Sequence, residues 1–195
     1  MTRSSSFPPV VGAKGAAAGS AGPGAAGDKV VGPEAKAIWD EPLDMAGMLA
    51  AAHHPGAGAV VLFSGEVRDH NQGRSVAFLE YEAHGPLAEK MIGDILSTAL
   101  AKWKLHIAVA RHRVGKVAIG ETAVVVITAS AHRSEAFEAN RYIIDRIKHE
   151  APIWKCEYYL DGTREWGDNC HCNENAFGGE YNKKPFAGEA KGLKD

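Results

Sequence analysis

The residues best suited to chemistry lie in the stretch SAHRSEAFEANRYIIDRIKHEAPIWK, from Ser130 to Lys155. His132 and Arg133 stand in the first turn of a predicted helix, where free backbone N–H groups and the helix dipole favour negative charge. Two cationic side chains there cost the helix a few tenths to about 1 kcal/mol. A bound phosphate or carboxylate would offset this cost, because N–H, imidazole and guanidinium groups converge on it. A solvated helix end explains the same residues equally well.

Two lysines flank the other end of this predicted helix. Lys148 lies in its last turn, where compensation of the helix dipole is the ordinary explanation. Lys155 lies on the strand predicted next, where a half-buried lysine can have a lowered pKa and act as nucleophile or base. The helix-to-strand corner is therefore a candidate reactive site. A third basic group follows a predicted buried strand, where loops often carry function, although a solvated loop also explains it: Arg68, His70 and Arg74.

The two ends of the helix are too far apart to share one small ligand. His132 and Lys148 are separated by 16 positions, which is roughly 24 Å at the helical rise of 1.5 Å per residue. Either the chain has two sites, or one site is completed by the second protomer of a homodimer. We favour the homodimer, and full activity of a monomer would rule it out.

A metal site is the other chemistry that the residue types allow. Cys170, His171 and Cys172 are adjacent, and Cys156 could join them. Zinc sites normally combine Cys-x-x-Cys or His pairs at typical spacings, which are missing here, so we expect no metal. No glycine-rich phosphate loop and no nucleophilic serine elbow is found either, and we expect no cofactor.

Composition excludes several classes of protein. The 195 residues carry 22 Lys and Arg against 24 Asp and Glu, a formal net charge of −2, so bulk charge attracts neither nucleic acid nor an anionic membrane. No apolar run approaches the roughly 18 residues of a membrane span, and no secretory signal is visible. The chain has three cysteines, and this small, odd number argues against a disulfide framework. Such sparse use of cysteine is typical of a reducing compartment, so we predict that the protein is cytoplasmic.

The chain divides into one domain between two tails. Residues 1–35 are predicted to be a flexible tail rich in Ala and Gly, and residues 167–195 a polar C-terminal tail. Hydrophobic residues make up 45% of the chain, so residues 36–166 can form a real core. We expect one compact α+β domain, with sheet and helices packed in layers.

Hydrophobic periodicity predicts the elements of this domain. One short helix over 44–53 and two long ones are expected. The second helix spans 86–103, with Leu87, Met91, Ile95 and Ala99 on its buried stripe, and the third is capped by Ser130 and stopped by Pro152. A polar loop is predicted over 69–74, and Val124–Ile127 suits a central strand buried on both faces. The strands are predicted over 36–39, 58–68, 75–82, 106–114, 122–129 and 153–160.

Four segments taken together resemble one known family. They are GEVRDHNQG (65–73), LEYEAH (79–84), SAHRSEAFEA (130–139) and KHEAPIWK (148–155). In order and with natural spacing, they resemble the large, catalytic subunit of molybdopterin synthase over about residues 36–166. The resemblance implies an α/β-hammerhead-type fold with a mixed sheet, and a central homodimer with a small ubiquitin-like sulfur carrier at each end.

The resemblance also implies a reaction and a set of site residues. The C-terminal Gly-Gly thiocarboxylate of the separate carrier enters a pocket, and sulfur is transferred twice to cyclic pyranopterin monophosphate, giving the molybdopterin dithiolene. Lys148 and Lys155 are the expected catalytic residues; either could act as general acid–base or stabilise an acyl intermediate. The expected substrate-binding residues are Arg68, His132, Arg133, Glu66, Val67, Cys156 and Glu157.

A different class of function uses the same basic residues. A non-catalytic dimeric module could hold a phosphorylated ligand or the acidic tail of a partner. Lys148 and Lys155 distinguish the two hypotheses, because a binding module tolerates replacement of lysine by arginine and a proton-transferring lysine does not. A zinc protein built on Cys156, Cys170 and Cys172 is a third hypothesis, which the absence of bound metal would remove.

Overall fold

The computed structural model of the chain describes residues 32–167. The predicted flexible N-terminal tail, the predicted polar C-terminal tail and the zinc hypothesis that uses Cys170 and Cys172 therefore fall largely or wholly outside the described residues. Ala35, at the end of the predicted N-terminal tail, is only 7% exposed. Within the described part of the chain, no helix is long and apolar enough to cross a membrane.

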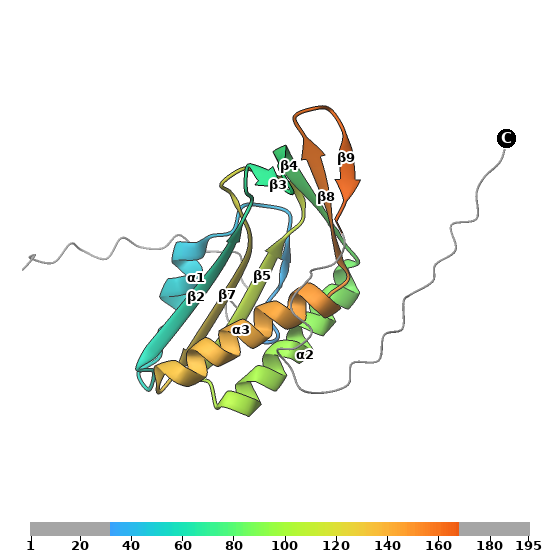
Figure 1. Cartoon of the computed structure of the whole chain (residues 1–195). Coiled ribbons are helices and arrows are strands. Elements are labelled where there is room, and N and C mark those ends of the chain that lie inside the picture. Colours follow the sequence, from blue (N-terminus) through green and yellow to red (C-terminus); the bar gives the residue numbers. More distant parts are fainter. Residues whose placement is uncertain (1–31, 168–195) are drawn as a thin grey trace, which may run out of the picture.

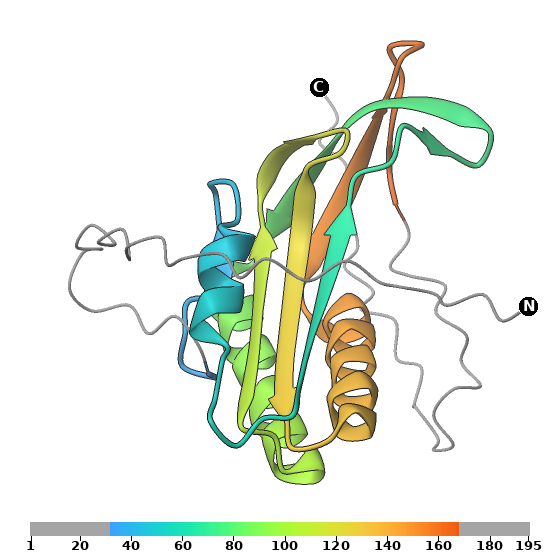
Figure 2. The ribbon, with the colours of Figure 1, turned by 90° about the vertical axis from the view of Figure 1, so that its left-hand side faces the viewer.

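The first sheet forms the middle layer of the molecule (Figures 1 and 2). Its strands lie in the order β1-β5-β7-β2, and only β1 and β5 pair in parallel. Residues 123–130 of β7 are all buried, which confirms a central strand covered on both faces. The strands are β1 (Ile38–Trp39), β2 (Ala59–Glu66), β5 (Ile107–Arg113) and β7 (Thr122–Ser130).

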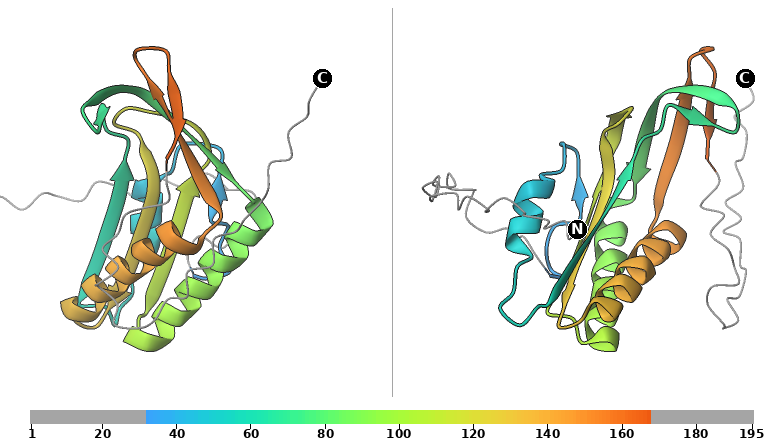
Figure 3. Two further views of the ribbon diagram at one scale, coloured as in Figure 1. Left: turned by 45° about the vertical axis from the view of Figure 1, so that its right-hand side comes forward. Right: turned by 60° about the vertical axis from the view of Figure 1, so that its left-hand side comes forward.

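Three helices cover the two faces of this sheet. The short helix α1 (Met45–Ala51) lies on one face, and α2 (Gly85–Trp103) and α3 (Arg133–Glu150) lie side by side on the other (Figures 1 and 3). The largest core cluster joins α2 and α3 to the sheet through residues such as Ile92, Ile143 and Val126. The predicted α+β class of hammerhead type, with two long helices and one short one, is confirmed.

The buried stripe of α2 differs from the predicted one. Ile95 and Ala99 are buried as expected, but Leu87 is 45% exposed and Met91 is only half-buried. Steps of four residues advance by 40° each around a helix, so a stripe built only from such steps drifts away from the core. The observed stripe mixes steps of three and four: Ala88, Ile92, Ile95, Leu96 and Ala99.

The start of α3 also corrects a prediction. Ser130 does not cap the helix, because it remains in β7, where it pairs with Ala59 of β2. Its hydroxyl donates a hydrogen bond of 2.6 Å to the carbonyl of His132. His132 is the N-cap residue, and its side chain makes no capping hydrogen bond. The other end is as predicted, since α3 ends at Glu150, just before Pro152.

A second, antiparallel sheet packs at one end of the first, and its β8–β9 hairpin projects from the molecule (Figure 1). Its central strand, β4, pairs with β6 and β8. The prediction of a polar loop over 69–74 is wrong, because β3 and β4 form a hairpin there. The two turn residues of this hairpin, Gln72 and Gly73, both have positive φ. The strands are β3 (His70–Asn71), β4 (Arg74–Ala83), β6 (Gly115–Ala118), β8 (Ile153–Tyr159) and β9 (Arg164–Trp166).

Candidate active site

A pocket of about 240 Å³ lies where the two sheets and the C-terminal end of α3 meet. It draws on four separate parts of the chain: the segment after β2, the β3–β4 hairpin, the last turn of α3 and the start of β8. Five of the predicted site residues share it, together with five others. The lining residues are Glu66, Arg68, His70, Asn71, Val76, Leu79, Tyr81, Lys148, Lys155 and Glu157.

The corner between α3 and β8 places both predicted catalytic lysines in this pocket. Lys148 lies in the last turn of α3, and the chain reaches Lys155 through Ala151 and Pro152. Although Lys148 as a whole residue is exposed, partial desolvation lowers its pKa. The positive charges of Lys155 and Arg68 lower the pKa further, against an opposing effect of Asp145. Lys148 therefore loses its proton more readily than an ordinary lysine.

Lys155 is held by a buried carboxylate. Its ammonium group lies 2.7 Å from Glu157, whose side chain is 5% exposed. Asn71 and the Tyr159 hydroxyl donate hydrogen bonds of 2.7 and 3.0 Å to the other oxygen of Glu157. Burial alone would raise the pKa of Glu157, but these hydrogen bonds and the charge of Lys155 outweigh it, and the pKa is lowered. Glu157 thus stays ionised and pairs with Lys155.

The end of β2 brings Arg68 and Glu66 to the pocket. The pairing of β2 with β7 shifts between Gly65 and Glu66. A Cβ atom on Gly65 would lie 2.6 Å from a methyl group of Val124, so this close approach needs glycine. Val67, between the two charged residues, is 3% exposed and belongs to the core beside the pocket, where its backbone bonds to Glu121 and Gly120. Its side chain does not line the pocket.

His132 and Arg133 are not brought to this pocket. Both are exposed at the opposite end of α3 from Lys148. Neither lines the hollow that contains the two lysines. The separation that the sequence predicts along the helix is therefore present within one protomer.

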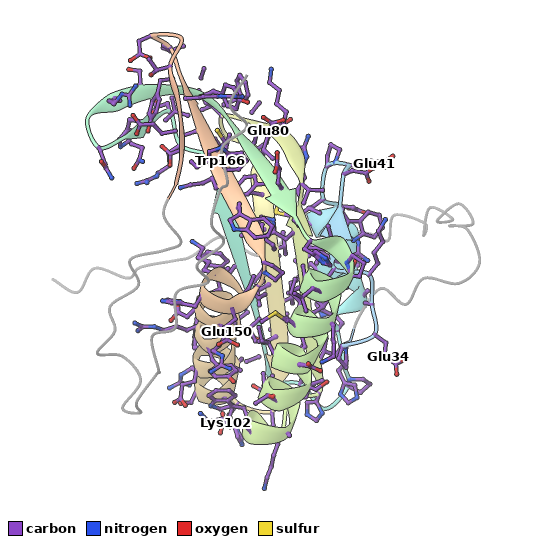
Figure 4. All side chains as sticks on the ribbon, turned by 90° about the vertical axis from the view of Figure 1, so that its right-hand side faces the viewer. Glu34, Glu41, Glu80, Lys102, Glu150 and Trp166 are labelled. Atoms are coloured by element: carbon purple, nitrogen blue, oxygen red, sulfur yellow. The ribbon has the colours of Figure 1, made fainter. Side chains whose placement is uncertain are left out.

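Cys156 points away from the pocket as well. Neighbouring residues of a strand face opposite sides of the sheet, so Cys156 lies on the side opposite Lys155 and Glu157. Across the strands it is paired with Glu80 and Trp166, which Figure 4 shows on the outer part of the second sheet. Burial raises the pKa of the Cys156 thiol, which is 1% exposed. Among residues 32–167, no cluster of side chains suits a metal ion.

The third basic group is divided by the β3–β4 hairpin. His70 lines the pocket and bonds to Asp69 at 2.6 Å. Arg74 instead faces the β8–β9 turn, where it pairs with Asp161 at 3.0 Å and with Glu165. Arg74 therefore braces the second sheet and does not contribute to the pocket.

Sequence reasoning missed polar and aromatic residues in and behind this pocket. Asn71 holds Glu157, Tyr81 lines the pocket opposite Lys155, and His112 packs edge-on against the Tyr81 ring at 5.0 Å. Burial lowers the pKa of His112 to about 4. The alternation of Leu79 and Tyr81 with polar residues along β4 was the available signal, because it marks the side chains of the inner face.

The arrangement suits an anionic substrate that undergoes proton transfer. Arg68, Lys148 and Lys155 surround one hollow, and Glu157 neutralises only one of these charges directly. Such a pocket attracts a phosphate or carboxylate. A lysine with a lowered pKa beside a charged lysine can act as acid or base while the other stabilises negative charge.

Comparison with known proteins identifies the family. The model of the MoaE protein family matches residues 38–150. A molybdopterin synthase catalytic subunit of Nostoc sp. is 39% identical over 140 residues, which cover 71% of this chain and 85% of the relative. Molybdopterin synthase catalytic subunit 1 of Mycobacterium tuberculosis is 42% identical over 132 residues, which cover 67% of this chain and 89% of the relative.

A solved structure agrees with these matches. The crystal structure of molybdopterin synthase from Staphylococcus aureus superposes with a TM-score of 0.65 at 36% sequence identity. The match covers 72% of this chain and 98% of the S. aureus chain. Sequence and structure lead to the same conclusion: the chain belongs to the MoaE family of molybdopterin synthase catalytic subunits.

Proposed function

We propose that this chain is a sulfurtransferase, the catalytic subunit of a molybdopterin synthase. It takes sulfur from the C-terminal thiocarboxylate of a small ubiquitin-like carrier and transfers it to cyclic pyranopterin monophosphate, which becomes the dithiolene of molybdopterin. The observation that carries this proposal is the convergence of Lys148, Lys155 and Arg68 on one pocket. Both substrates are anionic where they react or bind, so this charge distribution suits them.

The chemistry needs no nucleophile from the protein. The thiocarboxylate sulfur attacks a side-chain carbon of the pterin, and as the carbon–sulfur bond forms, the carbon–oxygen bond at that carbon breaks and the oxygen leaves on the phosphate or, once protonated, as water. Carrier and substrate are then linked through a thioester. Water then attacks the acyl carbon, the carbon–sulfur bond to the carrier breaks, and the sulfur remains on the pterin. The carrier leaves as a carboxylate, and a second thiocarboxylate repeats the sequence. The protein must move protons and stabilise the negative charge that develops on the acyl oxygen.

The two lysines divide this work. Lys148 has the lowered pKa and is the general acid–base. The ammonium group of Lys155 is paired with the ionised Glu157 at 2.7 Å, and this fixed position suits stabilisation of the anionic intermediate. Arg68 provides a further positive charge for the phosphate. Val67 and Cys156, whose side chains lie outside the pocket, act through the backbone or through packing.

A second copy of the chain completes the site. Among the described residues, the outer edge of β2 pairs with no strand. The start of β2, at Ala59, lies beside the N-terminal end of α3, and its end, at Glu66, lies at the pocket. A two-fold axis beside β2 makes the two copies of this strand antiparallel. His132 and Arg133 of each protomer then approach the pocket of the other.

Beside this edge, α3 presents an exposed apolar side chain. Phe137 is 60% exposed on α3, and Leu62 is 36% exposed on β2. Burying these side chains would contribute to a dimer interface. Together, the homodimer and one carrier per protomer form a heterotetramer. We also propose that residues 36–166 are the catalytic domain and that the enzyme works in the cytoplasm, as the few cysteines of the chain suggest.

A single-turnover assay tests this function. The protein is mixed with thiocarboxylated carrier and cyclic pyranopterin monophosphate, and the dithiolene product is followed. We expect product from the native chain and at least a roughly hundredfold lower rate for Lys148→Arg, since arginine keeps the charge and cannot transfer the proton. The rate of Lys155→Arg is expected to fall less than that of Lys148→Arg, because Lys155 contributes mainly its positive charge.

The matched control is Lys102→Arg, at the far end of the helical layer (Figure 4), which should leave the rate unchanged. If the native chain binds carrier and pterin stably but forms no product, the proposal that it is an enzyme would be refuted. This result would support the non-catalytic binding module instead. A Lys148→Arg variant with the native rate would refute the acid–base role of Lys148.

A further inference from the structure

Tyr81 lines the pocket, and the proposed reaction gives it no role. It lies on β4 directly opposite Lys155 of β8, so both side chains emerge on the same face of the sheet. Burial and the negative charge of Glu157 raise the pKa of Tyr81 to about 12. Its hydroxyl therefore keeps its proton at physiological pH and remains a hydrogen-bond donor.

The hydroxyl of Tyr81 has no protein partner among residues 32–167. The neighbouring tyrosines differ, since the Tyr159 hydroxyl bonds to Glu157 at 3.0 Å and the Tyr158 hydroxyl to Glu80 at 2.7 Å. Tyr81 is half-buried and lines the pocket, so its hydroxyl is free to donate a hydrogen bond to a molecule bound there. A ligand in the pocket would provide the missing acceptor.

The ring of Tyr81 is held in place from behind. His112 meets it edge-to-face, with ring centres 5.0 Å apart and planes at 68°. His112 is itself fixed, because it is 8% exposed and its Nδ1 donates a hydrogen bond of 2.8 Å to the Arg113 carbonyl. The ring also packs on the core cluster that contains Leu79 and Val117. The hydroxyl is therefore presented to the pocket on a rigid support.

We propose that Tyr81 contacts the substrate by donating a hydrogen bond to one of its anionic oxygens, and that His112 is a positioning residue for its ring. The oxygen is anionic because Arg68, Lys148 and Lys155 surround the same hollow. The identity of the ligands rests on the proposed function. Both the pterin phosphate and the acyl group of the carrier tail offer such an oxygen, and the experiment separates the two.

The test compares Tyr81→Phe with Tyr158→Phe, which removes a hydroxyl from the opposite face of the second sheet. Calorimetry measures binding of cyclic pyranopterin monophosphate and of thiocarboxylated carrier separately, and the single-turnover assay measures the rate. For Tyr81→Phe we expect a roughly ten- to hundredfold loss in the affinity of one ligand, or in the rate if the bond forms only in the intermediate. Tyr158→Phe should change neither by more than about twofold.

The ligand whose affinity falls is the one that Tyr81 contacts. Native affinities and a native rate for Tyr81→Phe would overturn the proposal. If the native chain binds both ligands and forms no dithiolene, the proposed function fails, while the calorimetric comparison still tests Tyr81. If the native chain binds neither ligand, both proposals are refuted.

The positioning role of His112 needs a readout that a loss of stability does not produce. His112→Ala should lower the rate, and His112→Phe, which keeps an aromatic edge against Tyr81, should restore most of it. In a Tyr81→Phe background, His112→Ala should have no further effect on the rate of the folded protein. Additive effects of the two changes would show that His112 acts independently of Tyr81 and would overturn this part of the proposal.

Discussion

At the scale of single residues, His112 links the pocket to the stability of the fold. Its pKa is about 4 in the folded chain, against an ordinary value of 6.5, because burial disfavours the charged imidazolium. The unfolded chain therefore binds more protons between these pH values, and stability falls as the pH decreases through this window. From pH 8 to pH 5, His112 should remove about 2 kcal/mol from the free energy of unfolding.

Urea unfolding of the native chain and of His112→Phe at several pH values checks this prediction. Phenylalanine keeps an aromatic ring in the buried position and cannot bind a proton. The variant should therefore lose this part of the pH dependence. Identical slopes for the two proteins would show that His112 is not the group responsible.

Glu157 is a second residue whose charge matters for the fold. Its carboxylate accepts hydrogen bonds from Asn71 and Tyr159 and pairs with Lys155. Glu157→Gln removes the charge and turns one acceptor into a donor, so the free energy of unfolding at pH 7 should fall by about 1–3 kcal/mol. The same substitution at Glu165 should cost clearly less, because its pair with Arg74 is exposed to solvent. Equal losses at the two positions in urea unfolding would contradict the buried network.

At the scale of elements, a single asparagine fastens α3 to the first sheet. Asn140 is 4% exposed, and its side-chain amide donates to the carbonyls of Val61 on β2 and Val126 on β7, each at 3.1 Å. Asn140→Leu leaves these acceptors without that donor and should lower the free energy of unfolding by roughly 2–4 kcal/mol. Ser97→Leu, on the exposed side of α2, should change it by no more than about 0.5 kcal/mol. Chemical denaturation of both variants makes the comparison.

The elements that could be predicted from the sequence are those with long, regular patterns. The β-branched run in β7 and the apolar spacing of Ile143, Ile144 and Ile147 in α3 each determine one structure, and both were found. The four residues of β6 and the three of β9 are too short to show any period. Their formation depends on pairing with β4 and β8, which local sequence does not encode.

The same distinction applies to the candidate site. Lys148 and Lys155 could be predicted to lie together because a single tight corner joins them. Tyr81 and Asn71 could not, because they reach the pocket through the register of β4 and β8 and through a contact with Glu157, 86 positions away. The orientation of Cys156 could have been predicted, because it alternates with Lys155 and Glu157 along one strand.

At the scale of the whole molecule, the proposed dimer makes each pocket a product of two chains. Lys148→Ala should inactivate the half of each pocket that contains the lysines. Changing both His132 and Arg133 to alanine should inactivate the half that the other protomer contributes. Each variant alone should be inactive. After unfolding and refolding in equal amounts, half of the dimers are mixed, and each mixed dimer carries one intact pocket, so about a quarter of the native activity should return.

The single-turnover assay on the mixed preparation provides the measurement, and each variant refolded alone serves as the control. If all site residues came from one protomer, mixing would restore nothing. A native-like, fully active monomer in sedimentation experiments would exclude the shared pocket outright.

The pairing of β4 with β8 also has a consequence for protein synthesis. The paired residues Leu79 of β4 and Glu157 of β8 are 78 positions apart, which corresponds to roughly 4–16 s at ~5–20 residues per second on the ribosome. Strand β4 pairs with both β6 and β8. Because β6 is synthesised first, it covers one edge of β4 while the edge that will pair with β8 stays open. An open strand edge is a template for association with neighbouring nascent chains. We therefore expect slow translation of residues 119–152 to prolong this exposure and to lower the yield of soluble protein.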